Sequence, residues 1–189
     1  MQPIYLIEGP VGAGKSTFSR RLARRLPGVH LALDEWFVRL YSPDRPSTDF
    51  VNWYLQRKER LLGLMWAHAK SLASANMQPI LELGLIQRQA RHDFYEQARR
   101  EGVPLRVYLL DAPEDVRWER VEHRNENKGE TFSMIVPRQI FEVASSMWEP
   151  PDEDELRAQQ IEVVSATESD KTLIESNAAP SMLTERPRQ

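Results

Sequence analysis

A glycine-rich segment near the start of the chain ends in a lysine and two hydroxyl residues. Residues 9–16 read GPVGAGKS and match the pattern G-x-x-x-x-G-K-[ST] in full. Glycines in such a segment let backbone N–H groups wrap around phosphate oxygens, and the N-terminus of a following helix adds its dipole. The pattern predicts a nucleotide phosphate site made of Gly9, Pro10, Val11, Gly12, Ala13, Gly14, Lys15, Ser16 and Thr17.

The polar side chains of this segment have distinct predicted roles with ATP and Mg²⁺. We expect Lys15 to contact the β and γ phosphates, Ser16 to ligate Mg²⁺ and Thr17 to contact a phosphate. A short apolar run at 4–7 precedes the segment and a predicted helix at 15–26 follows it, which is the strand–loop–helix context that the pattern requires. The pattern does not indicate which group receives the phosphate.

Asp34 directly follows a second apolar run, residues 29–33. If that run is a parallel strand, its carboxyl end lies at the same edge of the sheet as the glycine-rich segment. A carboxylate there can accept the proton of an attacking hydroxyl, so Asp34 is the predicted general base and a predicted contact of the acceptor. The alternative is that Asp34 caps a helix over residues 35–41.

Glu82 lies in a third apolar run, residues 79–83, at the same predicted edge. In one interpretation Glu82 belongs to the coordination shell of Mg²⁺, next to the acceptor. In the other it forms an ion pair with Arg88 or Arg91. These two arginines are one helical turn apart just beyond the edge, where they can bind an anionic or hydroxyl-rich acceptor. Solvated arginines at the start of a helix are the alternative.

Arginines also gather on one face of a predicted helix that starts at residue 114. Phosphoryl transfer spreads negative charge over oxygens, and arginines on a closing lid stabilise it. Arg120 and Arg124 therefore carry a predicted lid role, since the polar segment 125–133 follows them. The alternative is surface ion pairing of the helix arginines Arg117, Arg120 and Arg124 with Glu114, Glu119 and Glu122.

The elements that must position these side chains alternate between strands and helices. Five apolar runs, the last at 161–164, are separated by helical patterns, which predicts an α/β fold with a mainly parallel sheet. Together with the complete motif at 9–16, this pattern indicates the P-loop NTPase fold. The pattern predicts a long amphipathic helix over 49–73, with His68 packed in the core. Nearer the C-terminus, residues 152–155 are predicted to form an acidic linker. We expect one domain over 1–165, with a lid around 125–133, and a tail over 166–189.

Composition narrows the class of protein further. The chain has 189 residues, no cysteine and a formal net charge of −3. The absence of cysteine excludes disulfides, thiol nucleophiles and thiolate zinc sites. The negative charge argues against a dedicated nucleic-acid binder, although a local basic groove stays possible. No secretory signal or membrane-spanning run is evident, so we expect a cytoplasmic protein with no membrane partner.

Several segments together resemble the small P-loop kinases grouped as AAA-type ATP-binding proteins, relatives of zeta toxins, chloramphenicol phosphotransferase and polynucleotide 5′-kinases. The matching segments span about residues 1 to 165 and are GPVGAGKST, LDEWFVRLY, ILELGLIQRQAR, YLLDAPEDVRWERVEHRN and FEVASSMWEPPDEDE. The resemblance implies that Asp34 is the general base, that Arg120 and Arg124 are lid arginines, and that Gly84 is the glycine after the third strand. Glu82 stands where such proteins commonly carry aspartate.

The expected function is therefore ATP- and Mg²⁺-dependent transfer of a phosphoryl group to a hydroxyl of a small molecule. Two alternatives stay open: a polynucleotide 5′-hydroxyl kinase, and a nucleotide-dependent ATPase or switch without a small-molecule acceptor. The sequence leaves the acceptor, the choice between ATP and GTP, and the oligomeric state undetermined.

Overall fold

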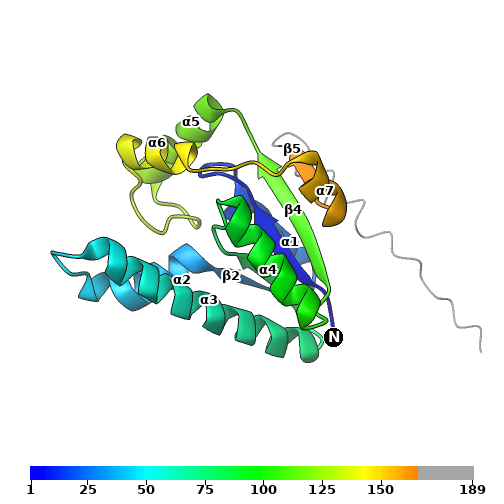
Figure 1. The fold of residues 1–189 in the computed structure, drawn as a ribbon. Coiled ribbons are helices and arrows are strands. Elements are labelled where there is room, and N and C mark those ends of the chain that lie inside the picture. The colour runs from blue at the N-terminus through cyan, green and yellow to red at the C-terminus, as the bar shows by residue number, and fades with distance from the viewer. Residues whose placement is uncertain (166–189) are drawn as a thin grey trace, which may run out of the picture.

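A computed structural model describes residues 1–165 and shows a parallel sheet covered by helices (Figure 1). Its strand order is β2-β3-β1-β4-β5, and every neighbouring pair is parallel. The strands are β1 (Ile4–Glu8), β2 (Gly28–Ala32), β3 (Gln78–Glu82), β4 (Leu105–Asp111) and β5 (Glu162–Ser165). The predicted α/β class is confirmed, whereas the predicted tail at 166–189 lies outside the described residues.

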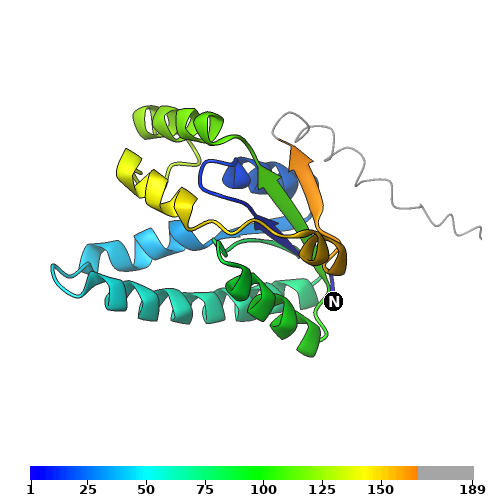
Figure 2. The ribbon, with the colours of Figure 1, turned by 45° about the horizontal axis from the view of Figure 1, so that its top comes forward.

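The helices connect consecutive strands and cover both faces of the sheet (Figure 2). They are α1 (Lys15–Arg25), α2 (Leu33–Tyr41), the short 3₁₀ helix η1 (Ser42–Asp44), α3 (Phe50–Ser74), α4 (Arg88–Arg100), α5 (Glu114–Asn127), α6 (Arg138–Ser146) and α7 (Glu153–Ala158). Helices α5 and α6 lie across from the α2–α3 hairpin at the carboxyl end of the sheet. Within residues 1–165, no helix combines the length and apolarity needed to span a bilayer.

Alternate residues of β1 supply the cores on the two faces, as the twofold repeat of a strand requires. Tyr5 and Ile7 pack against α1, whereas Ile4 and Leu6 pack against α3 and α4. Both cores are filled by side chains with almost no exposed surface. The sheet is therefore rigid where its central strand ends, and the glycine-rich segment starts at that point.

Two local predictions were wrong. His68 is exposed on α3, with its ring 6.1 Å from that of Trp36, because the buried stripe passes through Met65 and Ala69 instead. The acidic linker is in fact the start of α7. Asp152 caps this helix, since its Oδ1 accepts a hydrogen bond from the backbone N–H of Glu155 at 2.8 Å.

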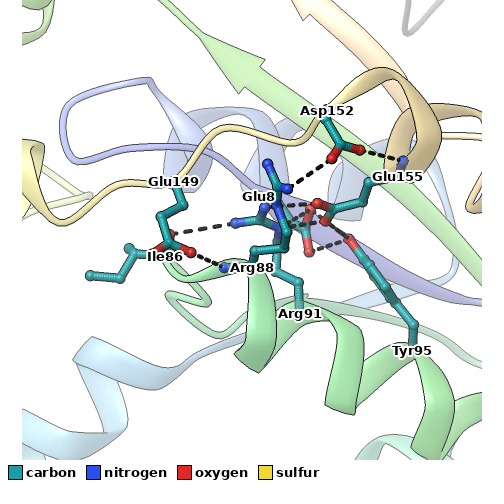
Figure 3. Close-up of polar contacts among 8 residues, drawn as sticks. All are labelled: Glu8, Ile86, Arg88, Arg91, Tyr95, Glu149, Asp152 and Glu155. Atoms are coloured by element: carbon teal, nitrogen blue, oxygen red, sulfur yellow. Dashed lines mark hydrogen bonds and ion pairs between the residues drawn. The ribbon is translucent and has the colours of Figure 1, made fainter.

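A buried polar cluster joins the end of β1 to α4 and α7 (Figure 3). Tyr95 donates its hydroxyl to the two carboxylate oxygens of Glu8, at 2.8 and 2.9 Å. Arg91 is fully buried and donates two hydrogen bonds to Glu155, at 2.6 and 2.9 Å, while its Nε lies 4.0 Å from Glu8. Two carboxyl groups thus lie at one guanidinium, and Glu8 is farther from it than Glu155.

Folding strongly changes the titration of the Glu8 carboxyl group. Burial raises the pKa of Glu8 from 4.5 to about 8, against the opposing effects of the Tyr95 hydrogen bond and the Arg91 charge. The folded chain therefore holds a proton on Glu8 at pH values where the unfolded chain has lost it. The stabilisation from this proton is complete below about pH 4.5 and is lost as the pH rises through about 8.

We predict that Glu8→Gln removes this pH dependence, because glutamine copies the neutral acid in size. The unfolding free energy of the wild type, measured in urea at pH 5 to 9, should fall relative to that of the variant. The slope should be at most about 1.4 kcal/mol per pH unit, levelling off above about pH 8. Parallel curves for the two proteins would show that Glu8 is ionised throughout.

Candidate active site at the carboxyl end of the sheet

The glycine-rich segment runs between β1 and α1 with two points of very close approach. A Cβ on Gly9 would lie 2.1 Å from the carbonyl oxygen of Leu110, and a Cβ on Gly12 would lie 2.5 Å from that of Arg117. Both glycines have positive φ, at 138° and 79°. Only glycine fits these positions, so the segment is held against β4 and α5. We call residues 9–16 the phosphate loop.

The donors of the phosphate loop point to an anion. Gly14 directly precedes α1, and in the described part of the chain no side chain caps this helix and its first turn holds no acidic residue. Its first backbone N–H groups can therefore bind phosphate oxygens together with the positive end of the helix dipole. Lys15 donates from Nζ to the carbonyl oxygen of Pro10 at 2.7 Å, and Thr17 is exposed in the same turn.

Glu82 joins the phosphate loop to β2 and pairs with neither predicted arginine. Its Oε1 accepts a hydrogen bond from Ser16 Oγ at 2.9 Å, and its Oε2 lies 3.1 Å from His30 Nε2. Burial alone would raise the pKa of Glu82, but its hydrogen bonds with His30 and Ser16 and the charge of Lys15 lower it on balance. An ionised carboxylate thus lies beside the hydroxyl of Ser16.

Asp34 is the second residue of α2 and lies two positions after β2 ends at Ala32. The capping alternative is wrong, because Ala32 is the N-cap residue and no side chain caps this helix. The Asp34 side chain is accessible to solvent on one side and surrounded by charges on the others. Partial desolvation, followed by the charge of Glu82, raises the pKa of Asp34 against the opposing charge of Lys15, so its carboxylate is more basic than an ordinary aspartate.

The three arginines of α5 divide into one structural and two site residues. Arg117 is buried and donates to the carbonyl oxygens of Val11, at 3.0 Å, and Ala112, at 3.1 Å. Arg120 places Nη1 3.5 Å from the carbonyl oxygen of Ala13. Arg124 feels the charges of both site carboxylates, and its buried Nε has no hydrogen-bond partner among the described residues. The alternative of surface ion pairs along α5 is seen only as a 3.9 Å contact between Arg117 and Glu114.

The other predicted acceptor residues lie elsewhere. The prediction for Arg91 was wrong, since its side chain is fully buried and its donors bind Glu155. Arg88 is on the surface, where its Nη1 pairs with Asp152 Oδ2 at 2.8 Å. Arg88 therefore attaches the segment before α7 to α4, and Arg91 attaches α7 itself to α4. Neither side chain lies at the candidate site.

Lys58 and His30 belong to this region, although the sequence analysis did not select them. Lys58 is half-buried on α3, and the charge of Asp34 acts on it. It lies four residues after Tyr54 and three before Leu61, on the apolar stripe of that helix, so a charge within the stripe was the available signal. For His30 the available signal was a polar side chain within the apolar run 29–33.

An open, shallow cavity of about 440 Å³ lies at the carboxyl ends of β4 and β5. The guanidinium of Arg117 donates to the carbonyl oxygen of Ala112, which lines the cavity. It also donates to the carbonyl oxygen of Val11, which belongs to the phosphate loop. The cavity is therefore a neighbour of the loop. Its lining residues are Asp111, Ala112, Pro113, Val163 and Val164.

We predict that Gly12→Ala weakens ADP binding by about tenfold or more, because the new Cβ collides with Arg117 and alanine disfavours positive φ. Calorimetric titration with ADP measures this. Gly63→Ala on α3 is the matched control, since a Cβ there meets no atom within 4 Å. Equal affinities of the two variants would contradict the geometry assigned to the loop.

Comparison with known proteins identifies the family. A family model described as an AAA domain matches residues 4–151, which is most of the chain. No curated protein matches the sequence.

Solved structures share the fold at low sequence identity. A gluconokinase from Sinorhizobium meliloti 1021 is 20% identical with a TM-score of 0.57, over 93% of this chain and 90% of that one. Kti12 from Chaetomium thermophilum in complex with ADP-AlF3 is 16% identical with a TM-score of 0.66, over 94% and 100%. A chain of the Pnkp1/Rnl/Hen1 RNA repair complex is 18% identical with a TM-score of 0.58, over 84% and 45%. The chain therefore belongs to the AAA domain family and has the fold of the small P-loop kinases.

Proposed function

We propose that this protein is a kinase that transfers the γ-phosphoryl group of ATP to a hydroxyl of a small molecule. The observation that carries the proposal is the position of Asp34, whose charge interacts with that of Lys15 in the phosphate loop while its side chain stays open to solvent. A basic carboxylate beside a phosphate site, within reach of a diffusing molecule, suits the activation of an acceptor hydroxyl.

In this proposal the acceptor oxygen attacks the γ-phosphorus as its proton passes to Asp34. The bond from the γ-phosphorus to the bridging oxygen breaks, and ADP leaves with that electron pair. Lys15 and the loop N–H groups hold the β and γ phosphates through the step. Arg120 and Arg124 stand on α5 beside the loop, where their guanidinium groups stabilise charge on the transferred oxygens.

The residues present fit a magnesium ion held chiefly by the nucleotide. Ser16 Oγ and Glu82 Oε1 are 2.9 Å apart, and both are the hard oxygen ligands that Mg²⁺ prefers. Within residues 1–165 no cluster of three acidic or histidine side chains suits a metal, so phosphates and water would complete the shell. When bound, the ion neutralises phosphate charge, while Ser16 and Glu82 hold it in place.

The remaining parts of the site support the same assignment. The cavity at Ala112 and Val163 is partly apolar and lies beside the loop, so we assign it to the base of the nucleotide. The solved relatives include a gluconokinase and a protein bound to ADP-AlF3, which agrees with phosphotransfer. The relative from an RNA repair complex keeps a polynucleotide acceptor as the second candidate, but the net charge of −3 disfavours it.

Mass spectrometry of a metabolite extract incubated with the protein, ATP and Mg²⁺ tests the proposal. We predict a product 80 Da heavier than one metabolite, formed by the wild type and nearly abolished in Lys15→Ala, which loses the loop cation at the phosphates. Phosphorylation of an added oligonucleotide 5′ end instead would favour the second candidate. ADP release without any phosphorylated product would favour an ATPase or switch.

We predict that Asp34→Asn separates binding from chemistry. Asparagine keeps the size of the side chain but cannot accept the hydroxyl proton, so kcat should fall by roughly 10² to 10⁴. Affinity for ADP and Mg²⁺ should change little, because the loop and Ser16 hold them. Glu35→Gln is the control: Glu35 pairs with Arg39 at 2.9 Å and Arg20 at 3.6 Å. Full turnover by Asp34→Asn would exclude Asp34 as the base.

A further inference from the structure

Lys58 is a half-buried cation for which the reaction above has no use. Its ammonium makes no hydrogen bond and no ion pair with any other residue of the described range 1–165. Lysines that lose part of their water normally gain a protein partner, because an unpaired charge is costly to bury. The position of Lys58 therefore needs an explanation outside the packing of α3.

The pairing of α2 with α3 directs Lys58 toward Asp34. The two helices run antiparallel as a hairpin (Figure 2), and the rings of Phe37 and Tyr54 lie 4.9 Å apart between them. Asp34 lies three residues before Phe37, and Lys58 lies four residues after Tyr54. In an antiparallel pair these steps lead in the same direction, so Lys58 and Asp34 stand on the same level of the hairpin.

The charges that act on Lys58 differ from those that act on the cations beside the phosphate loop. Among the site carboxylates, Asp34 acts on Lys58, whereas Lys15 and Arg124 feel both Asp34 and Glu82. Lys58 is also farther from Asp34 than the 4.0 Å of an ion pair, since none is formed between them. Lys58 is therefore a neighbour of the base without being its structural partner.

Tyr54 adds a second donor to the same wall. It lies one turn before Lys58 on the same face of α3 and is half-buried. Its pKa is raised by burial and then by the charge of Asp34, so the carboxylate of Asp34 acts on Tyr54 as it does on Lys58. Within residues 1–165 this hydroxyl has no hydrogen-bond partner. Two donors without protein acceptors thus line the acceptor side of Asp34.

We propose that Lys58, together with Tyr54, binds an anionic group of the phosphate acceptor, a carboxylate or a phosphate ester, while the acceptor hydroxyl faces Asp34. This inference rests on the proposed function and specifies its substrate class. A neutral polyol would leave the ammonium of Lys58 without a partner in a partly desolvated site. Sites built around such donors discriminate strongly against analogues that lack the matching group.

Binding of matched acid and neutral molecules tests the inference without requiring turnover. The protein with Mg²⁺ and a non-hydrolysable ATP analogue is titrated calorimetrically with gluconate and glucitol, glycerate and glycerol, and glucose 6-phosphate and glucose. We predict that at least one acid binds roughly 10- to 100-fold more tightly than its neutral partner, the range expected for a hydrogen bond to a charged group. Whether carboxylates or phosphate esters are preferred identifies the source of the anionic group.

Three substitutions connect this preference to Lys58. Lys58→Met should abolish the preference for the acid and leave binding of its neutral partner unchanged, whereas Lys58→Arg should retain it. Lys70→Met is the matched control on the same helix, where Lys70 pairs with Glu101. The melting temperature of each variant shows that it is folded.

The inference is overturned if no acid binds, if neutral partners bind as tightly, or if Lys58→Met keeps the preference. Failure of the kinase proposal has a different signature. Acid binding that depends on Lys58, with no phosphorylation when ATP replaces the analogue, would keep the anion site and reject the kinase. Phosphorylation confined to neutral molecules would keep the kinase proposal and reject the anion site.

Discussion

The contact of the phosphate loop with the end of β4 and with α5 determines the rest of the site. The backbone approaches at Gly9 and Gly12 leave no space for a side chain, and Arg117 binds carbonyls of the loop and of the β4–α5 turn. The loop and α5 therefore form one packed unit. Because Arg120 and Arg124 belong to that helix, the contact that shapes the loop also carries the two guanidinium groups to it.

The chain contains two kinds of polar cluster, and they differ in how completely their groups are paired. In the cluster of Glu8, Arg91, Tyr95 and Glu155 nearly every donor and acceptor is used, as expected for polar groups that stabilise a core. At the carboxyl end of the sheet, Lys58 and the Nε of Arg124 have no partner among the described residues. Unpaired donors near two carboxylates favour this end of the sheet as the candidate ligand site.

Most of the fold and the centre of the site could be predicted because their signals are local. Residues 9–16 carry a complete motif, and short apolar runs marked all five strands of the described chain. The errors concern choices made by tertiary packing. Whether Arg91 faces a ligand or Glu155 depends on a residue more than 20 positions away, and whether His68 or Ala69 continues the stripe beyond Met65 depends on a small rotation of a helix. Lys58 was missed because the carboxylate that it neighbours, Asp34, lies on another helix.

The strand order has a consequence for how the chain reaches its folded state. The central strand β1 is made first during synthesis, but it pairs with β3, where Tyr5 is aligned with Ile80, and with β4, where Ile4 is aligned with Leu105. The phosphate loop packs against Leu110 and Arg117, so it cannot take its final shape until these residues have left the ribosome. The surroundings of Glu8 are completed later still, because they include Glu155. β1 therefore has neither neighbouring strand until β3 has been synthesised, and it lacks the second until β4 follows, so an apolar strand is exposed to aggregation during that interval.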